Sequence, residues 1–360
     1  MRNVFIFNPG PAVLPEPVLE STSKAAINFA NTGMSIMEVS HRSKEFDALI
    51  NETISLLKDI MGIPENYKVL FLQGGASLQF AMVPMNLLGA GKTADYIDTG
   101  SWSSNAIKEA KKIGQVNVAA SSKDQDYTRI PSPDEIKLTP GAAYCHITSN
   151  NTIYGSQWQS FPDTKDVPLI ADMSSDILSR VIDVSKFGLI YAGAQKNMGP
   201  SGVTVVIIRD DLAELAPDNT PTMLKYSTHV SKNSMHNTCP VLPIFVVHEV
   251  LKWIIDQGGV AAIEKLNEKK AALIYDILDS SDFYRGTVQK DSRSKMNIPF
   301  RLPSEDLEKE FLSAASAKGL VGLKGHRSVG GIRASMYNAL PMEGAQRLAD
   351  FMTAFAKEKS

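Results

Sequence analysis

The feature that most constrains the fold is an alternation of short apolar runs with longer segments of helical spacing. Four such runs are "AAYCHITSN", "VPLIADMSS", "FGLIYAGA" and "GVTVVIIR". They are short and continuous, as expected of buried strands, and the last is rich in β-branched residues. The segments "KVLFLQGGASLQFAMVPMNLL" and "ADYIDTGSWSSNAIKEAKKIG" each predict a strand, a small-residue turn and a helix. This order predicts an α/β fold with a mostly parallel sheet covered by helices.

The remaining helical segments suggest two domains of unequal size. Further helices are predicted over residues 15–30, 40–62, 241–255 and 260–278, and near Glu305 and Glu343. The apolar helix that ends before "DQGG" would close the first domain, and the charged helix after it could bridge to the second. Strand-like "MNIPFRL" and "GIRASMY" belong to that second part. We therefore predict a large domain of residues 16–258 and a smaller α+β domain of residues 1–15 and 259–360.

Composition excludes several classes of protein. The 360 residues carry a net charge of −2 and are 43% hydrophobic, which is typical of an ordinary soluble globular protein and not of one that binds a polyanion. No apolar stretch approaches the roughly 20 residues that span a bilayer, and the start has no signal-peptide layout. Cys145 and Cys239 are far apart and lack metal-ligand spacing. We therefore expect no membrane partner, no metal site, no disulfide framework and a cytoplasmic location.

The residues whose side chains could take part in binding or catalysis lie where the predicted strands end. In open α/β sheets, ligands bind beyond the carboxyl ends of the strands. The exits here are "QGGAS", "DTGSW", "ITSNNT", "ADMSSD" and "AGAQKN", which are rich in small residues, hydroxyls and amides. The last contains Lys196 in a glycine-lined turn between two apolar strands. Such a lysine is either exposed on a turn or placed where its amine is needed.

This set of residues matches the needs of pyridoxal phosphate. The aldehyde of that cofactor requires a lysine amine, and its ring nitrogen requires a carboxylate that keeps it protonated. Lys196 is the candidate amine, and Asp172 at the end of "PLIAD" is the candidate carboxylate. Ala76 and Ser77 begin a predicted helix, whose N-terminus can hold the phosphate. Trp102, at the next helix start, is the candidate that stacks on the ring.

Motifs along nearly the whole chain resemble the phosphoserine aminotransferase family, which belongs to the fold-type I group of enzymes that use pyridoxal phosphate. In order, they are "FNPGPA", "SHRSKEF", "GGASLQF", "TGSWS", "SNNTIYG", "ADMSSD", "AGAQKNMGPSG", "HNTCP" and "GHRSVGGIRASMYN". The seventh and ninth are the most specific, because neighbouring families share the lysine and the aspartate but not these flanks. The resemblance implies an aspartate-aminotransferase-like fold.

The resemblance also implies roles for individual residues. Lys196 would be the Schiff-base lysine, Asp172 the partner of the ring nitrogen, and Trp102 the residue over the ring. Thr152 would bond to the ring hydroxyl. The residues implied for the cofactor phosphate are Ala76, Ser77 and Gln195 of one chain, with Asn237 and Thr238 of a second subunit. The functional unit would therefore be a homodimer with shared active sites.

The reaction that the resemblance implies is a ping-pong transamination in serine biosynthesis. Glutamate would give 2-oxoglutarate, and 3-phosphohydroxypyruvate would give O-phosphoserine. Both amino acids carry two anionic groups, which planar guanidinium groups can bind bidentately. Arg333 is the implied clamp for the α-carboxylate. The groups expected to share the distal anion are His41, Arg42, His326 and Arg327.

Two further points follow from the resemblance. Some relatives carry an arginine where this chain has Ser77, so the distal anion would depend more on the His-Arg pairs here. The family resemblance also permits a second substrate, 3-hydroxy-2-oxo-4-phosphooxybutanoate of pyridoxine biosynthesis.

Other interpretations stay open on the sequence alone. Taken singly, Asp172 could cap a helix, Trp102 could be core, and Arg42 or Arg327 could form a surface ion pair. Thr152, Ser77 and Thr238 could be ordinary turn or cap residues. A related alanine–glyoxylate or serine–pyruvate aminotransferase, or a desulfurase, would use the same cofactor. A non-catalytic protein that binds a phosphorylated ligand is the alternative from another class.

Overall fold

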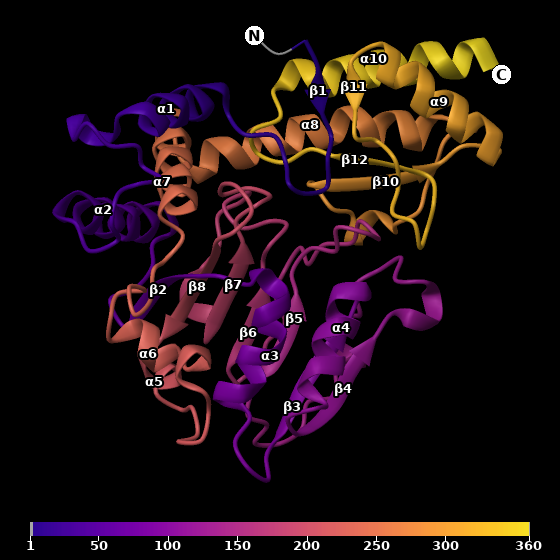
Figure 1. Cartoon of the computed structure of the whole chain (residues 1–360). Coiled ribbons are helices and arrows are strands. Elements are labelled where there is room, and N and C mark those ends of the chain that lie inside the picture. The colour runs from indigo at the N-terminus through magenta and orange to yellow at the C-terminus, as the bar shows by residue number, and fades with distance from the viewer. Residues whose placement is uncertain (1–2, 360) are drawn as a thin grey trace.

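The computed structural model describes residues 3–359, and a seven-stranded sheet lies at its centre (Figure 1). In spatial order its strands are β2 (Tyr67–Leu72), β8 (Thr204–Arg209), β7 (Leu189–Gly193), β6 (Leu169–Asp172), β5 (Cys145–Thr148), β3 (Thr93–Asp98) and β4 (Gln115–Ser121). Strand β8 runs antiparallel to both neighbours, and the other adjacent pairs are parallel. The prediction of a mostly parallel sheet is confirmed.

Helices cover both faces of this sheet. They are α1 (Glu16–Ile27), α2 (Lys44–Met61), α3 (Gly75–Leu87), α4 (Ser101–Ala110), α5 (Asp210–Ala213), α6 (Tyr226–Val230) and α7 (Val241–Asp256). Alternation along β2 shows the two layers: Val69 and Phe71 pack in the cluster that includes α2 and α7, whereas Leu70 and Leu72 pack with α3 and α4. Short 3₁₀ helices lie at Phe29–Asn31, Lys123–Gln125, Pro133–Glu135, Val184–Lys186, Thr222–Leu224 and Lys290–Ser292.

Local signals explain where α2 begins and ends. The Ser43 hydroxyl accepts a hydrogen bond from the Phe46 N–H at 3.2 Å, which satisfies one of the free donors of the first turn. Gly62 follows the helix with φ of +62°, the left-handed conformation that favours glycine. Both signals are visible in the sequence, and the predicted helix over this segment is confirmed.

Two sequence predictions in this part need correction. Strand β4 was not predicted, because it forms an edge of the sheet and its partly exposed sequence "QVNVAAS" lacks a continuous apolar run. Helix α4 was expected to extend to Gly114 but ends at Ala110. Two tight turns follow, in which Ile113 and Gly114 both donate to the Ala110 carbonyl oxygen.

The C-terminal part builds a second apolar core with the N-terminal segment. Its elements are α8 (Val260–Ser280), β9 (Arg285–Gly286), β10 (Asn297–Arg301), α9 (Glu305–Ala317), β11 (Leu320–Val321), β12 (Ile332–Ser335) and α10 (Met342–Lys359). Strands β12, β10 and β9 form an antiparallel sheet, and β1 (Phe5–Ile6) pairs in parallel with β11 (Figure 1). Phe7 packs in this second core. The division into residues 16–258 and residues 1–15 with 259–360 stays a prediction, which this separate core supports.

Helix α8 links the two cores. Val260 and Ile263, in its first turns, pack in the large-domain cluster, whereas Ala271 and Ile274 pack in the second core. No helix within residues 3–359 combines the length and apolarity that crossing a membrane requires.

A buried lysine on α8 secures the turn that follows β12. The Lys270 side chain is 0% exposed. Its Nζ donates to the carbonyl oxygens of Tyr337 at 2.9 Å, Leu340 at 3.1 Å and Met336 at 3.5 Å. Three acceptors match the three N–H donors of an ammonium group. The lysine therefore joins α8 to the chain between β12 and α10.

We predict that Lys270→Met destabilises the protein by about 3 kcal/mol, because buried carbonyl groups lose their donor. Urea denaturation would measure the loss. Lys269→Met is the matched control, since Lys269 lies on the same helix but is exposed. Equal stabilities of the two variants would contradict the prediction.

Candidate active site

A cavity of about 170 Å³ lies at the carboxyl ends of the central strands, beside the N-terminus of α3. It brings together residues from separate strand exits. Those predicted from the sequence are Ala76, Ser77, Trp102, Asp172, Gln195 and Lys196, and the others are Gly75, Thr148, Asn150, Ser174, Ser175, Gly193, Ser201, Gly202 and Val203. The candidate amine and the candidate carboxylate therefore share one cavity.

Lys196 lies in the turn between β7 and β8, and two hydroxyl groups hold its amine. Its Nζ donates to Thr152 Oγ1 at 2.7 Å and to Ser175 Oγ at 2.8 Å. Burial lowers the pKa of Lys196 to about 8, although the charge of Asp172 acts in the opposite direction. The result is a lysine that is partly neutral near physiological pH.

Asp172 ends β6 and is 4% exposed. Its Oδ1 accepts hydrogen bonds from the Ser174 N–H at 2.9 Å and from the Ser174 hydroxyl at 2.6 Å. Burial raises the pKa of this carboxyl group, while the bonds from Ser174 and the charge of Lys196 lower it. No residue in the described part of the chain donates to Oδ2. That oxygen is therefore left for a partner with an N–H group.

The start of α3 offers a cradle for an anion. Gly74 and Gly75 have φ of +89° and +66°, so the chain turns tightly into the helix. A Cβ on Gly74 would lie 2.6 Å from the Leu78 side chain. Gly74 has no side chain that could accept from the N–H groups of the first turn, and Ala76 and Ser77 of that turn line the cavity. Such a helix terminus suits a phosphate group.

Trp102 supplies the flat surface of the cavity from the first turn of α4. Asp98 orders that turn, since its Oδ1 accepts from the Ser103 hydroxyl at 2.9 Å and from the Ser104 hydroxyl at 2.8 Å. Among the residues that the structure describes, the buried Trp102 Nε1 and Thr148 Oγ1 have no hydrogen-bond partner. Trp102 and Thr148 both line the cavity.

Taken together, these residues fit pyridoxal phosphate. The site provides an amine of lowered pKa, a carboxylate with one free oxygen, a helix N-terminus and an indole ring. The unpaired polar atoms beside the cavity are consistent with a bound group that the chain itself does not supply.

Arg333 on β12 is a buried guanidinium group without a counterion. It is 4% exposed, and its Nη1 donates to the Thr152 carbonyl oxygen at 3.1 Å. Its Nε has no hydrogen-bond partner, and within residues 3–359 it forms no ion pair. Burial lowers its pKa. Since an unpaired buried charge is costly, the structure points to an anionic ligand here.

The other predicted substrate residues lie around the edge of the site. His326 is half-buried and bonds through Nδ1 to the Ser328 hydroxyl at 2.7 Å. Burial lowers the pKa of His326, and so do the charges of Arg333 and Arg327. Arg327 itself is exposed.

Eight of the predicted residues do not line the cavity: Thr152, Arg333, His326 and Arg327, described above, and His41, Arg42, Asn237 and Thr238. His41 is buried and Arg42 is exposed. Asn237 Nδ2 donates to Gln73 Oε1 at 3.4 Å, and Thr238 is exposed. Their predicted roles, in the substrate site and in a partner subunit's phosphate site, stay predictions.

Sequence reasoning missed the residues that support the two catalytic candidates. Ser174 holds Asp172, and its hydroxyl also accepts from the Gly193 N–H at 3.0 Å. Ser175 holds Lys196, and its hydroxyl lies 2.5 Å from Thr152 Oγ1. Both serines stand in "ADMSSD" directly after a predicted strand, which was the only available signal.

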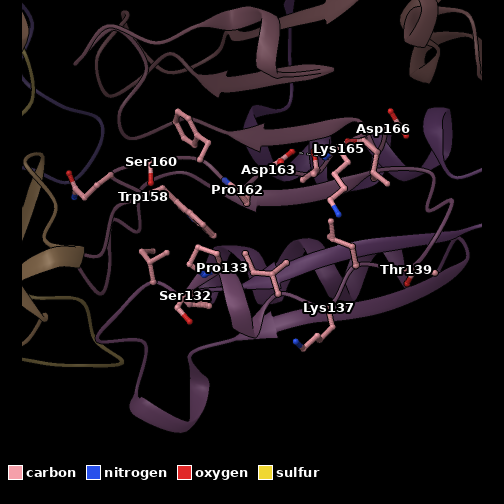
Figure 2. A pocket seen from close by; sticks show the side chains of 18 of the residues that line it. Ser132, Pro133, Lys137, Thr139, Trp158, Ser160, Pro162, Asp163, Lys165 and Asp166 are labelled. Carbon is pink, nitrogen blue, oxygen red and sulfur yellow. Dashed lines mark hydrogen bonds between the residues drawn. The ribbon is translucent and has the colours of Figure 1, made fainter.

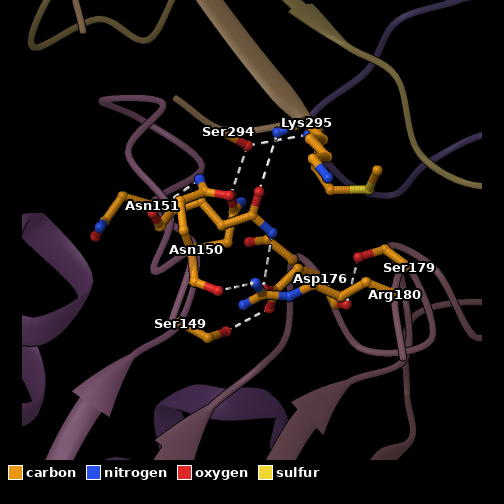
Figure 3. Close-up of polar contacts among 12 residues, drawn as sticks. Ser149, Asn150, Asn151, Asp176, Ser179, Arg180, Ser294 and Lys295 are labelled. Atoms are coloured by element: carbon orange, nitrogen blue, oxygen red, sulfur yellow. Dashed lines mark hydrogen bonds and ion pairs between the residues drawn. The ribbon is translucent and has the colours of Figure 1, made fainter. Parts of the chain in front are cut away.

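Asp176 anchors the turn that carries these serines (Figure 3). Its Oδ2 accepts from Gln157 Nε2 at 3.1 Å, its Oδ1 accepts from the Ser149 hydroxyl, and Arg180 lies 3.5 Å away as an ion-pair partner. Gln157 Oε1 in turn accepts from the Lys295 N–H at 3.0 Å. The turn is thereby tied to the small-domain side of the molecule.

Figure 2 shows a larger cavity of about 1140 Å³, between the segments 130–141 and 157–167. None of the predicted site residues lines it. Although this cavity is larger, it is therefore not the candidate active site.

Comparisons with known proteins agree with this geometry. The family model described as aminotransferase class-V matches residues 4–348. Phosphoserine aminotransferases of Desulfosudis oleivorans and Lysinibacillus sphaericus are each 58% identical to the chain, over 99% of both sequences. The solved phosphoserine aminotransferase of Bacillus circulans subsp. alkalophilus is 56% identical, with a TM-score of 0.97 over 99% of each chain.

More distant structures show the fold alone. Alanine–glyoxylate aminotransferase from Nostoc matches with a TM-score of 0.77 over 99% of this chain and 96% of its own, at 17% identity. The identity is therefore much higher to phosphoserine aminotransferases than to this alternative, and a non-catalytic binding protein is not supported. The chain belongs to the class-V aminotransferases and, within them, to the phosphoserine aminotransferase family, whose cofactor is pyridoxal phosphate.

Proposed function

We propose that the protein transfers the amino group of glutamate to 3-phosphohydroxypyruvate, forming 2-oxoglutarate and O-phosphoserine. The observation that carries this proposal is the position of Thr152 between two functional groups. Its hydroxyl binds the amine of Lys196, and its carbonyl oxygen binds the unpaired guanidinium group of Arg333. A substrate carboxylate at Arg333 would therefore place the α-carbon near the lysine amine.

Pyridoxal phosphate, when bound, supplies an aldehyde that exchanges amino groups and a protonated ring that accepts electrons from the substrate. Asp172 would hold the ring nitrogen through its free Oδ2. The residues of this chain that would hold the rest of the cofactor are Ala76, Ser77 and Gln195 at the phosphate, Thr152 at the ring hydroxyl and Trp102 over the ring.

Lys196 would act as the general base and acid. Because burial lowers its pKa to about 8, a neutral fraction of the amine is available to accept the α-proton. The resulting ammonium group would then donate that proton, on the same face, to the aldehyde-derived carbon of the cofactor and not to the α-carbon. Thr152 and Ser175 orient Nζ during both transfers, since each offers it an oxygen acceptor.

Binding of the anionic substrates would depend on positively charged side chains. Arg333 would bind the α-carboxylate, which replaces the missing counterion of a buried guanidinium group. His326 and Arg327, whose pair lies on the loop before β12, would take part in binding the distal phosphate or γ-carboxylate. Ser77 contributes no charge, so this distal site depends on the His-Arg pairs.

We further propose a homodimer with shared active sites. His41, Arg42, Asn237 and Thr238 lie outside the cavity of their own chain. Their position supports the interpretation that they serve the site of a partner subunit. The cytoplasmic location and the pyridoxine-pathway substrate stay predictions from the sequence and the resemblance.

We predict that the protein loaded with pyridoxal phosphate prefers 3-phosphohydroxypyruvate over pyruvate or glyoxylate by about a hundredfold in kcat/KM. The reason is that only the first substrate offers a distal anion to the His-Arg groups. A coupled assay of 2-oxoglutarate formation measures the preference.

Lys196→Ala should lose both turnover and the visible absorption of the bound cofactor. An intact visible spectrum in that variant would refute the assignment, and Lys186→Ala, at an exposed position, is the control.

The lowered pKa of Lys196 predicts a specific pH dependence of its reactivity. Only the neutral amine reacts with an acylating reagent, so the rate should rise as pH passes through about 8. Between pH 7 and pH 9 we expect roughly a tenfold increase in cofactor-free protein, whereas a lysine of ordinary pKa would show about a hundredfold increase. Mass spectrometry of the peptide that contains Lys196 measures the rate. A hundredfold increase at Lys196 would contradict the lowered pKa.

Arg333→Leu should lower kcat/KM by about a hundredfold for both glutamate and 3-phosphohydroxypyruvate, because each loses a charged hydrogen-bonded partner. Steady-state kinetics with each substrate in turn test this expectation. Cofactor affinity serves as the control and should stay unchanged. A loss confined to one substrate would contradict the role of Arg333 as the clamp for the α-carboxylate that both substrates carry.

A further inference from the structure

One face of the small antiparallel sheet is turned toward the loop that follows β5. In β10 and β12, Asn297 lies opposite Ser335 and Pro299 lies opposite Arg333. Directly opposite residues share a face of the sheet, and so do residues two apart along a strand. Arg333 therefore shares its face with Ser335 and Asn297.

Asn297 is fully hydrogen-bonded on that face. Its side chain is 0% exposed. Oδ1 accepts from Asn150 Nδ2 at 2.8 Å, and Nδ2 donates to Ser335 Oγ at 3.0 Å and to the Tyr337 hydroxyl at 3.2 Å. Both amide hydrogens and the carbonyl oxygen are thus in use. A buried amide with all partners present is satisfied in one geometry only, so it resists displacement.

The partners of Asn297 lie at the active site. Asn150 lines the cavity that contains Lys196 and also accepts from the Ser294 hydroxyl at 2.5 Å (Figure 3). The Tyr337 hydroxyl donates to the Pro9 carbonyl oxygen at 2.8 Å.

We propose that Asn297 is a positioning residue that fixes the Arg333 guanidinium group relative to the Lys196 amine. It touches neither the cavity nor the amine itself. Its bond to Asn150 sets where the small sheet meets the loop 150–152, and Arg333 extends from that same sheet to Thr152. The inference rests on the proposed function, because it takes Arg333 to bind a substrate carboxylate.

A displacement of the small sheet would change substrate binding before anything else. The residues that hold the cofactor belong to the large-domain strand exits, whereas Arg333 comes from β12. Loss of the Asn150–Asn297 bond would therefore misplace the carboxylate clamp and leave the cofactor cradle intact. Small misplacements of a positioning group have large effects on reactions that need aligned partners.

The test is Asn297→Ala in the enzyme loaded with pyridoxal phosphate. We expect KM for glutamate and KM for 3-phosphohydroxypyruvate both to rise by about tenfold, with a smaller change in kcat. Affinity for the cofactor, titrated by visible absorption, should stay at the wild-type value. Calorimetric binding of glutarate, a dicarboxylate that cannot react, should weaken by a similar factor.

Two further variants keep the test decisive. Asn86→Ala is the matched control, because Asn86 is equally buried and equally hydrogen-bonded, to Met82, Leu224 and Tyr226, within the large domain. It should lose stability without a change in KM. Tyr337→Phe removes one hydroxyl that Asn297 binds, and it should raise KM by a smaller factor in the same direction. This variant decides the matter if Asn297→Ala does not fold.

Failure of this inference is distinguishable from failure of the proposed function. A wild-type protein that does not turn over the two substrates refutes the proposed function, and with it this inference, before any variant is compared. An active wild type with unchanged KM in Asn297→Ala and Tyr337→Phe overturns the inference alone. So does a loss of cofactor affinity as large as the rise in KM.

Discussion

The burial of one lysine amine beside one carboxylate is the interaction on which the rest of the site depends. Removal from water favours the neutral form of Lys196 and also the neutral form of Asp172, while their mutual attraction favours both charges. The balance leaves an amine that can exchange protons near neutral pH. It holds only while the sheet is covered on both faces, because water at the strand ends would remove the effect of burial.

The turn after β6 concentrates the supporting contacts in very few residues. Four residues within five positions have four different roles. Asp172 lines the cavity, and the Ser174 hydroxyl accepts from the N–H at the end of β7. The Ser175 hydroxyl accepts from the lysine amine, and Asp176 accepts from the loop after β5. A short turn can do this because successive side chains leave the backbone in different directions. Any change in its backbone would therefore disturb the carboxylate and the amine together.

The residue proposed to bind the substrate carboxylate comes from the other part of the chain. Arg333 is buried without a counterion, which costs stability in the absence of an anion and favours anion binding in its presence. In the proposed function, the large domain would supply the chemistry and the cofactor cradle, whereas the small sheet would supply the clamp. The Asn150–Asn297 contact joins these two functions into one geometry.

The sequence by itself determined the α/β class, most strands and helices, and the residues with distinctive chemistry, because hydrophobic periodicity and strand-exit motifs are local. Lys196, Asp172 and Trp102 could be selected in this way. The edge strand β4 was not predicted, because a partly exposed strand lacks the continuous apolar run that marks a buried one. Only the tertiary structure decided that Ser175 holds Lys196, that Arg333 reaches Thr152 and that Asn297 meets Asn150. Those partners are 21, 181 and 147 positions apart in the chain, and a hydrogen bond between distant residues leaves no pattern in either segment.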